Sequence, residues 1–186
     1  MANHMECYVR VVNLTPEGET FLKEIFKSDE GEYEFYSGSV LKKLYGSTDE
    51  EIEDREYRTE NIGSKWIHGY VDHIEDGEAA ISTTSAWSVP YQMFLQFSDL
   101  LVKYSPDAII TGTYEDEGYD PCGAFIIAKN YEDIEDVFGT GDVDYDKLWE
   151  DDDYRDSISE KLHDETAHML EAHQEYLREI AEEEKA

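Results

Sequence analysis

The stretch from Asn61 to Pro90 constrains the fold more than any other part of the chain. Two segments of strand-forming residues, 65–73 and 79–86, flank the pair Asp76-Gly77. Asp-Gly between two such segments is a strong short-range signal for a tight turn joining antiparallel strands. The sequence therefore predicts a β-hairpin here, so that the architecture of the chain has to include an antiparallel sheet.

Further strands and helices are predicted on both sides of this hairpin. Residues 6–14 alternate in a way that predicts a strand, and Thr15 is a suitable cap for a helix that follows it. A second helix is expected over 88–103, followed by strands at 108–114 and 124–129. This order of elements is typical of an α+β fold with a ferredoxin-like antiparallel sheet and helices on one face.

Two segments stand apart from this pattern. Residues 28–60 are polar and acidic and are interpreted as an insertion with helical segments of its own. Residues 131–186 contain 21 acidic and 5 basic residues and are interpreted as an acidic helical extension, with a long helix beginning at Ser157. We therefore expect a ferredoxin-like domain over 1–130, followed by an extension that either lies on the domain or pairs with another copy in a homodimer.

The net charge of the chain limits its partners. Asp and Glu number 46 against 15 Lys and Arg, which gives a formal net charge of −31. Nucleic acids and anionic membranes are bound through Lys and Arg, so neither is an expected direct partner. A basic protein surface or a metal cation is complementary to this charge. Adaptation to high salt is an alternative, although the 10 lysines among the basic residues argue mildly against it.

The acidic runs of the extension are the first candidate binding surface. A rigid row of carboxylates can imitate the phosphates of a DNA duplex and occupy the nucleic-acid groove of a basic protein. A solvated surface without a partner is the alternative interpretation. The residues expected to contact a basic partner are Glu132, Asp133, Glu135, Asp136, Asp151, Asp152, Asp153 and Asp156.

A ligand cleft near the two tryptophans of the central stretch is the second candidate. Trp66 and Trp87 would form its floor beside Lys65, with Glu115 and Glu117 approaching from the loop after a predicted strand. Aromatic side chains more often fill a core, and acidic loop residues are more often solvated. The alternative function is accordingly a small-molecule or divalent-metal-binding module, with no metal ligands assigned.

No catalytic signature is recognised in the sequence. His163, His168 and His173 are five residues apart, a spacing that turns each by about 140° on a helix and does not suit zinc. Cys7 and Cys122 have no neighbouring thiol or base that would activate a nucleophile. No catalytic residue and no cofactor is predicted, the chain is interpreted as a non-enzyme, and the lone cysteines favour a reducing cytoplasm.

Four short motifs within residues 1–130 resemble those of one protein family. They are M-A-N-H at the start of the chain, N-I-G-S-K-W at 61–66, T-S-A-W-S-V-P at 84–90, and Y-E-D-E-G at 114–118 with a glycine five residues later. They are similar, in this order, to the family's opening, its N-W-G-T-K-W block, its T-A-W-S-P-P block and its acidic strand end. The family comprises uncharacterised phage and plasmid proteins with a YubB-type ferredoxin-like domain.

Two positions depart from the family pattern. Ile62 stands where the family has an aromatic residue, and Val89 stands where it has its first proline. The acidic extension lies outside the resemblance. The resemblance implies a ferredoxin-like fold and an origin in a mobile genetic element, and it implies no activity, so that no catalytic residue is carried over.

Charge and resemblance together predict a phage-type accessory protein of the host cell cytoplasm. We expect it to bind and inhibit a basic host protein that handles nucleic acid, such as a defence nuclease, a polymerase or a nucleoid protein. The DNA-mimicking acidic surface would make this contact, without direct binding to nucleic acid or membrane.

Overall fold

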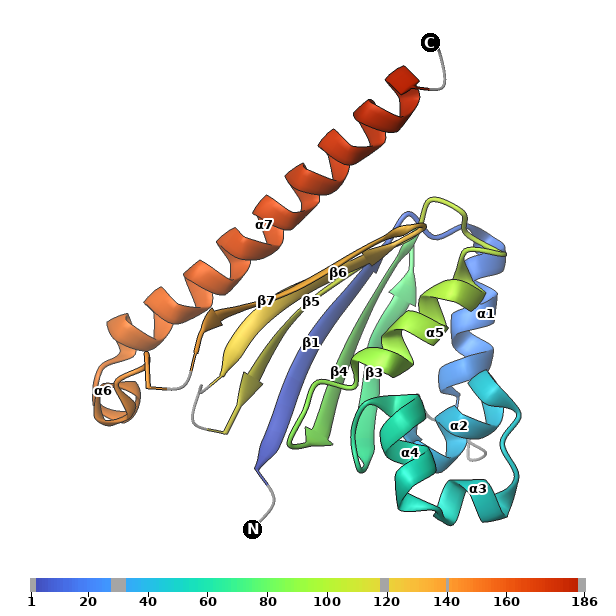
Figure 1. Ribbon diagram of the computed structural model, residues 1–186, viewed down its shortest axis with the longest axis horizontal. Helices are drawn as coiled ribbons and strands as arrows, with labels where there is room; N and C mark the ends of the chain where they lie inside the picture. Colours follow the sequence, from blue (N-terminus) through green and yellow to red (C-terminus); the bar gives the residue numbers. More distant parts are fainter. Residues whose placement is uncertain (1–2, 28–32, 118–120, 140, 184–186) are drawn as a thin grey trace.

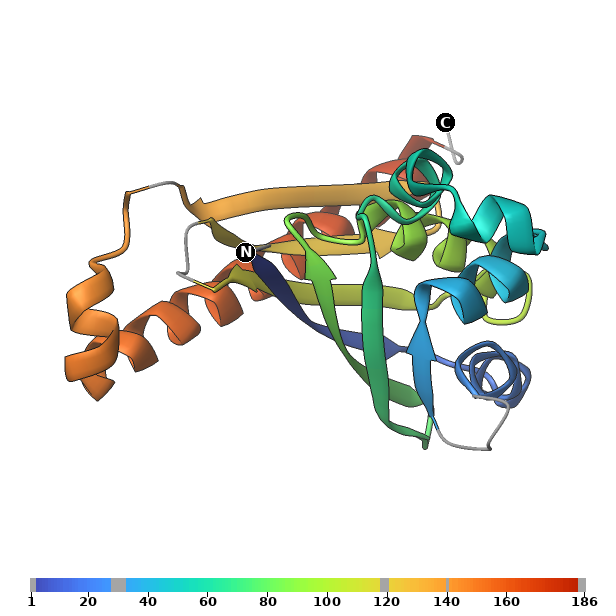
Figure 2. The same ribbon diagram turned by 90° about the horizontal axis from the view of Figure 1, so that it is seen from below.

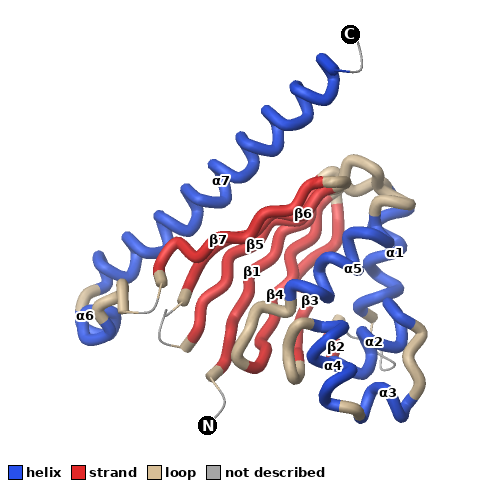
Figure 3. The backbone as a smooth tube through the Cα atoms, in the orientation of Figure 1, coloured by secondary structure: helices blue, strands red, loops and turns tan. Residues whose placement is uncertain are grey.

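The computed structural model describes residues 3–27, 33–117, 121–139 and 141–183, which form an α+β fold. Its strands make one seven-stranded sheet in the order β2-β3-β4-β1-β5-β6-β7, and every neighbouring pair is antiparallel (Figures 1 and 3). In chain order the strands are β1 (His4–Val12), β2 (Glu34–Tyr36), β3 (Ile67–Glu75), β4 (Glu78–Ala86), β5 (Ile109–Asp116), β6 (Cys122–Ala128) and β7 (Tyr131–Phe138).

Helices lie on both faces of this sheet. The helices of the described residues are α1 (Pro16–Phe26), α2 (Ser37–Tyr45), α3 (Asp49–Glu53), α4 (Arg55–Ile62), α5 (Tyr91–Leu101), α6 (Tyr145–Glu150) and α7 (Asp152–Glu183). Figures 1 and 2 show α1 to α5 on one side of the sheet, here called the first face, and α7 on the other side, the second face. The prediction of helices on one face therefore holds for α1 to α5, whereas α7 covers part of the opposite face.

The main hydrophobic core lies between the first face and helices α1 to α5. Val9 and Val11 of β1 belong to one buried cluster with Leu22 of α1 and Phe94 of α5. Strand alternation turns the intervening residues of β1, such as Tyr8, toward the second face. Tyr8 is 51% exposed, so part of the second face is left uncovered.

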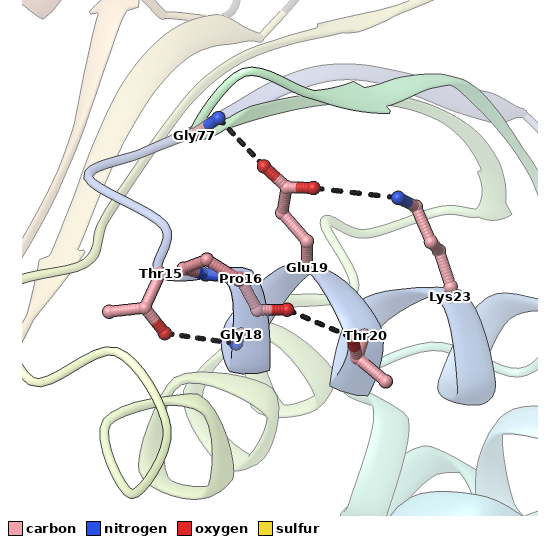
Figure 4. A network of polar contacts seen from close by, with 7 residues as sticks. All are labelled: Thr15, Pro16, Gly18, Glu19, Thr20, Lys23 and Gly77. Carbon is pink, nitrogen blue, oxygen red and sulfur yellow. Dashed lines mark hydrogen bonds and ion pairs between the residues drawn. The ribbon is translucent and has the colours of Figure 1, made fainter.

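The predicted hairpin is confirmed as β3 and β4. Asp76 and Gly77 both have positive φ, 54° and 83°, as the central residues of a two-residue I′ turn require. The turn is also tied to the beginning of α1 (Figure 4), because the Gly77 N–H donates to Glu19 Oε1 at 2.8 Å. The cap expected at Thr15 is present as well, since its hydroxyl accepts from the Gly18 N–H at 3.1 Å.

The insertion adds helices α2, α3 and α4 and one short strand, β2. Val40 and Leu41 of α2 and Ile62 of α4 are buried in the main core. Phe35 of β2 is 1% exposed and packs in the same cluster, while β2 pairs with β3 at the edge of the sheet. The helical segments agree with the prediction for this region, and the strand was not predicted because three residues carry too little pattern.

Substitution of Gly69 by alanine is expected to destabilise the fold by about 1–3 kcal/mol, the usual cost of overpacking. A Cβ at this position of β3 would lie 2.2 Å from the fully buried Phe35 ring, so the ring has to leave its place. Urea denaturation measures the change. Gly69→Ala should cost less stability in a Phe35→Leu background than in the unmodified chain, because the smaller side chain leaves room for the added Cβ. Strictly additive effects of the two substitutions would contradict this contact.

The acidic extension is built differently from the prediction. Residues 131–138 form strand β7 of the sheet rather than a part of a helical segment. The long helix begins at Asp152, five residues before Ser157. Ser157 is inside the helix, where its hydroxyl donates to the Tyr154 carbonyl at 2.7 Å, and it is Asp151 that accepts from the Tyr154 N–H. The residues S-I-S-E at 157–160 match a capping-box pattern, but they do not begin the helix.

Helix α7 packs on the sheet through one side. Ile158, Leu162, Met169 and His173 are its buried residues. Met169 lies in a cluster with Ala124 and Ile126 of β6 (cluster of the second face). The extension thus lies on the domain, as one of the two predicted arrangements requires.

Burial of His173 makes the stability of α7 depend on pH. Burial lowers the pKa of His173 from its ordinary value of 6.5, and the Nδ1 atom has no hydrogen-bond partner among the described residues. The unfolded chain therefore binds more protons near this pH, so stability is present above about pH 6.5 and is lost as the pH falls below it. We expect the Tm to fall between about pH 7.5 and pH 5.5.

A His173→Gln variant isolates this effect, because glutamine does not titrate. Its Tm should fall less over the same interval, and an unchanged pH dependence would show that other groups cause it. The pKa of Glu34, which bonds from Tyr36 and His68 lower from 4.5, adds a loss of stability only below about pH 4.5, outside this window.

Candidate binding surfaces

The acidic residues predicted on the extension are all exposed. In β7 these are Glu132, Asp133, Glu135 and Asp136, and all four lie on the edge strand of the sheet. Strand alternation places Glu132 and Asp136 toward the first face and Asp133 and Glu135 toward the second. Charged edge strands resist pairing with other strands, so this pattern also serves as protection against aggregation.

The negative charge of β7 acts on two neighbouring tyrosines. The Tyr114 hydroxyl donates to Asp136 Oδ1 at 2.5 Å. Burial and this hydrogen bond raise the pKa of Tyr114 well above its usual range. Burial, followed by the charges of Glu132 and Asp133, raises the pKa of Tyr91 of α5 in the same direction. Asp136 therefore has a structural contact, whereas Glu132 and Asp133 act on Tyr91 through their charge.

At the beginning of α7 the predicted aspartates have different roles. Asp151 accepts from the Tyr154 N–H at 3.1 Å and caps the helix. Asp152 forms an ion pair with Arg155. Asp153 and Asp156 are exposed, and no ion pair is found for them within the described residues. These last two are thus the aspartates of this group best placed to meet a partner.

A second hydrophobic cluster connects β7 with the beginning of α7. Cys122 of β6, Leu148 of α6, and Ile158 and Leu162 of α7 are its buried members. Phe138, at the end of β7, packs against this cluster, and the Lys161 Nζ lies 5.0 Å from the centre of its ring. Because strand, short helix and long helix share one cluster, the two groups of acidic residues are held on one connected framework.

The ligand cleft predicted around the tryptophans has only part of its expected form. Trp87 is 52% exposed, with the Lys65 Nζ 5.3 Å and the Arg55 guanidinium 5.9 Å from its ring centre. Trp66 is partly buried and meets the His4 ring edge-on at 5.4 Å. The exposed indole is therefore already contacted by two cations, which is a cation–π arrangement of the surface.

The predicted acidic members of that cleft lie at the same end of the sheet. The Glu117 N–H donates to the His4 carbonyl at 3.0 Å, which brings Glu117 near the Trp66 side of the sheet. Glu115 lies opposite Glu6 of β1 in the β1–β5 register, on the second face. The structure thus joins Trp66, Trp87 and Glu117 at one end of the sheet and places Glu115 along its second face.

A groove that the sequence did not predict lies between α7 and the second face. Its volume is about 530 Å³, and its lining is mostly apolar. Strands β1, β3, β4 and β5 form the floor and one wall, and α7 forms the other wall. The residues with side chains toward it include Tyr8, Arg10, Asp72, His73, Ala80, Ser82, Thr111, Thr113, His163, Thr166, Ala167 and Leu170.

The two cysteines and the acidic segment before α7 are the remaining features to be placed in the structure. Cys7 and Cys122 are both buried and form no disulfide within the described residues, and burial raises the pKa of Cys7 to about 12. Residues 145–150 of the acidic segment form α6, which Asp144 caps. In the described ranges no group of three His, Cys, Asp or Glu side chains could hold a metal ion. Within the same ranges, none of the helices is long and apolar enough to cross a membrane.

Comparisons with known proteins identified no relative of this chain. No protein-family model, curated protein or solved structure matches the chain. The similarity to YubB-type domains therefore remains a prediction from the four sequence motifs alone.

Proposed function

We propose that this protein is a phage-type accessory protein that binds a basic, nucleic-acid-handling protein of the host cytoplasm and blocks it competitively. The acidic residues of β7 and of the beginning of α7 form the contact surface. The target class is a nuclease of a defence system, a polymerase or a nucleoid protein. In this function the protein contacts neither nucleic acid nor membrane directly, because its surface repels both.

One observation carries the proposal: the acidic segments belong to ordered elements that share the cluster of Cys122, Leu148, Ile158 and Leu162. Mimicry of a duplex needs charges at fixed positions, and a loose acidic tail would not provide them. Carboxylates on one face of β7, such as Asp133 and Glu135, are two residues or roughly 6.8 Å apart, which is about two of the roughly 3.4 Å steps between successive charges of one DNA strand along the duplex axis.

The exposed carboxylates of α7 extend this row. Asp153, Asp156, Glu160 and Asp164 are exposed and lie three or four residues apart. On a helix this spacing corresponds to steps of about 4.5–6 Å along the axis. A strand and a helix therefore present carboxylates at intervals comparable to those of nucleic-acid phosphates.

The proposal includes a ferredoxin-like core. Strands β3, β4, β1 and β5 are neighbours in this order, and α1 and α5 connect β1 to β3 and β4 to β5 on the same face. This order of a β-α-β-β-α-β unit supports the assignment. Strand β2 would then be an addition at one edge, and β6 and β7 additions at the other.

Affinity capture from a bacterial lysate tests the function. The immobilised protein is eluted with a salt gradient, and a parallel sample is competed with duplex DNA. We expect a discrete basic protein that leaves at moderate salt and that DNA displaces, because phosphate contacts and carboxylate contacts use the same Lys and Arg. The proposal fails if no captured protein is displaced by DNA.

A further inference from the structure

The wall of the groove formed by α7 differs in charge from the rest of that helix. Toward the groove the helix presents His163, Thr166, Ala167 and Leu170. Gln174 and Leu177 continue this side at helical spacing. No carboxylate occurs in this stripe, which is about 21 Å long. Leu177 is 49% exposed, so the stripe includes an apolar side chain in contact with solvent.

The side of the helix next to this stripe is acidic. Glu160, Asp164, Glu171 and Glu175 are exposed there. An extended uncharged stripe in such an acidic helix is not needed for solubility, and Figure 1 shows the last turns of α7 running past the sheet. A long uncharged stripe that packs on the sheet only in part, through Leu170, is typical of a surface that contacts another chain.

The sheet beside this stripe is suited to the close approach of a helix. The second-face side chains of β4 and β5 at the groove are small: Ala80, Ser82, Thr111 and Thr113. Small side chains let a helix approach a neighbouring element more closely. Helix α7 covers β5, β6 and β7, and the space beside it over β1 and β4 is open. A second helix there would complete the layer.

The charged side chains inside the groove have polar partners, and charge around it is negative. Arg10 is paired with Glu78 at 2.7 Å, and the Ser82 hydroxyl donates to Asp72 at 2.9 Å. Tyr8, His73 and His163 are the other ionisable lining groups. Along the rim lie the acidic side of α7 and the carboxylates of the open sheet face. An occupant complementary to these features has an uncharged contact face and basic flanks.

From these features we infer that the groove binds an amphipathic helix of the basic partner, with its small and apolar face toward Ala167 and Leu170 and its Lys or Arg residues along the rim. This inference rests on the proposed function and identifies the element of the partner that is bound. Helix-in-groove recognition is a common mode for such surfaces. The acidic row of β7 and α7 then supplies long-range attraction, and the groove supplies specificity.

The length and charge of the surface favour this occupant over two others. The groove volume would suit a small molecule, but the uncharged stripe continues to Leu177, beyond the part that lines the groove. A second copy of this chain would bring a further net charge of −31 and a second acidic α7 to the interface. Repulsion between two such chains opposes that dimer.

A pair of synthetic peptides tests the inference. One is an amphipathic helix with a Leu and Ala face and Lys flanks, and the other has the same composition in scrambled order. Binding is measured by calorimetry at about 150 mM salt, where long-range attraction is screened beyond roughly 8 Å. We expect the helical peptide to bind at least about tenfold more tightly than the scrambled one, a difference of about 1.4 kcal/mol.

Two matched variants locate the site. Ala167→Trp fills the groove, whereas Ala172→Trp places the same side chain at an exposed position of α7 outside the groove lining. Ala167→Trp should remove the preference for the helical peptide, and Ala172→Trp should retain it. Circular dichroism and Tm confirm that both variants are folded before binding is compared.

Three results would overturn the inference: equal binding of both peptides to the unmodified chain, equal behaviour of the two variants, or a dimer in sedimentation equilibrium that Ala167→Trp dissociates. The last result would assign the groove to a second copy. Failure of the proposed function is distinguished by DNA competition in the capture experiment, which does not depend on the groove preference.

Discussion

Replacing Met169 by aspartate is expected to lower the free energy of unfolding by about 3–5 kcal/mol, the range for a buried charge left without a partner. Met169 is 2% exposed and packs between α7 and the β6 residues Ala124 and Ile126. Those neighbours are apolar, so they offer a carboxylate no hydrogen-bond donor from their side chains. The introduced carboxylate can reach solvent only if α7 leaves the sheet. Urea denaturation followed by circular dichroism measures the loss.

Leu177→Asp is the matched control. Leu177 lies eight residues further along the same helix and is 49% exposed. Introducing aspartate there changes the net charge by the same amount and should alter stability by no more than about 0.5 kcal/mol, as is usual for surface sites. If the two substitutions cost the same, α7 does not pack on the second face in solution. The groove between the helix and the sheet would then not exist.

The parts of the fold that the sequence predicted are those with local signals. The Asp76-Gly77 turn and the cap at Thr15 need only a few neighbouring residues to be recognised. The long helix of the extension also has a local signal, because helical spacing places Ile158, Leu162 and Met169 on one side. Each of these features is confirmed, because each is decided within one or two turns of the chain.

The strand at 131–138 was missed for a physical reason. Its acidic residues fall on both sides of the strand, since only one neighbour pairs with this edge and no face is fully buried. The alternation that signals a half-buried strand is therefore absent. The pattern at Ser157 was misleading for another reason: a good capping pattern inside a helix carries no information about the cap that Asp151 provides six residues upstream.

Neither candidate surface follows from the sequence alone. The groove combines residues of β1, β3, β4, β5 and α7, and it exists only because α7 returns across the second face. Its one sequence signal was the run of uncharged residues on one side of an acidic helix. For the acidic row, the sequence supplied the residues but not their separate roles. Asp136, Asp151 and Asp152 have structural partners, whereas Asp153 and Asp156 are exposed at the beginning of α7.

These roles define a charge-reversal variant that keeps the fold. Changing Glu132, Glu135, Asp153 and Asp156 to lysine spares the residues with structural contacts. We expect affinity for a DNA-displaced basic partner to fall at least about 100-fold, which corresponds to about 2.8 kcal/mol. The reason is that each reversal replaces an attraction to a partner cation by a repulsion. Asp153 lies in the first turn of α7, so its reversal costs about 0.3–1 kcal/mol of stability, which a Tm measurement detects.

A second variant separates a defined surface from net charge. Reversing Glu24, Glu53, Glu60 and Asp99, which are exposed on helices α1, α3, α4 and α5, changes the formal charge of −31 by the same amount. These residues lie on the side of the sheet opposite α7 (Figure 1). Calorimetry of the two variants against one partner should show a large loss for the first and a loss below about tenfold for the second, since distant charges are screened. Equal losses would mean that the partner responds to total charge, and mimicry by β7 and α7 would be excluded.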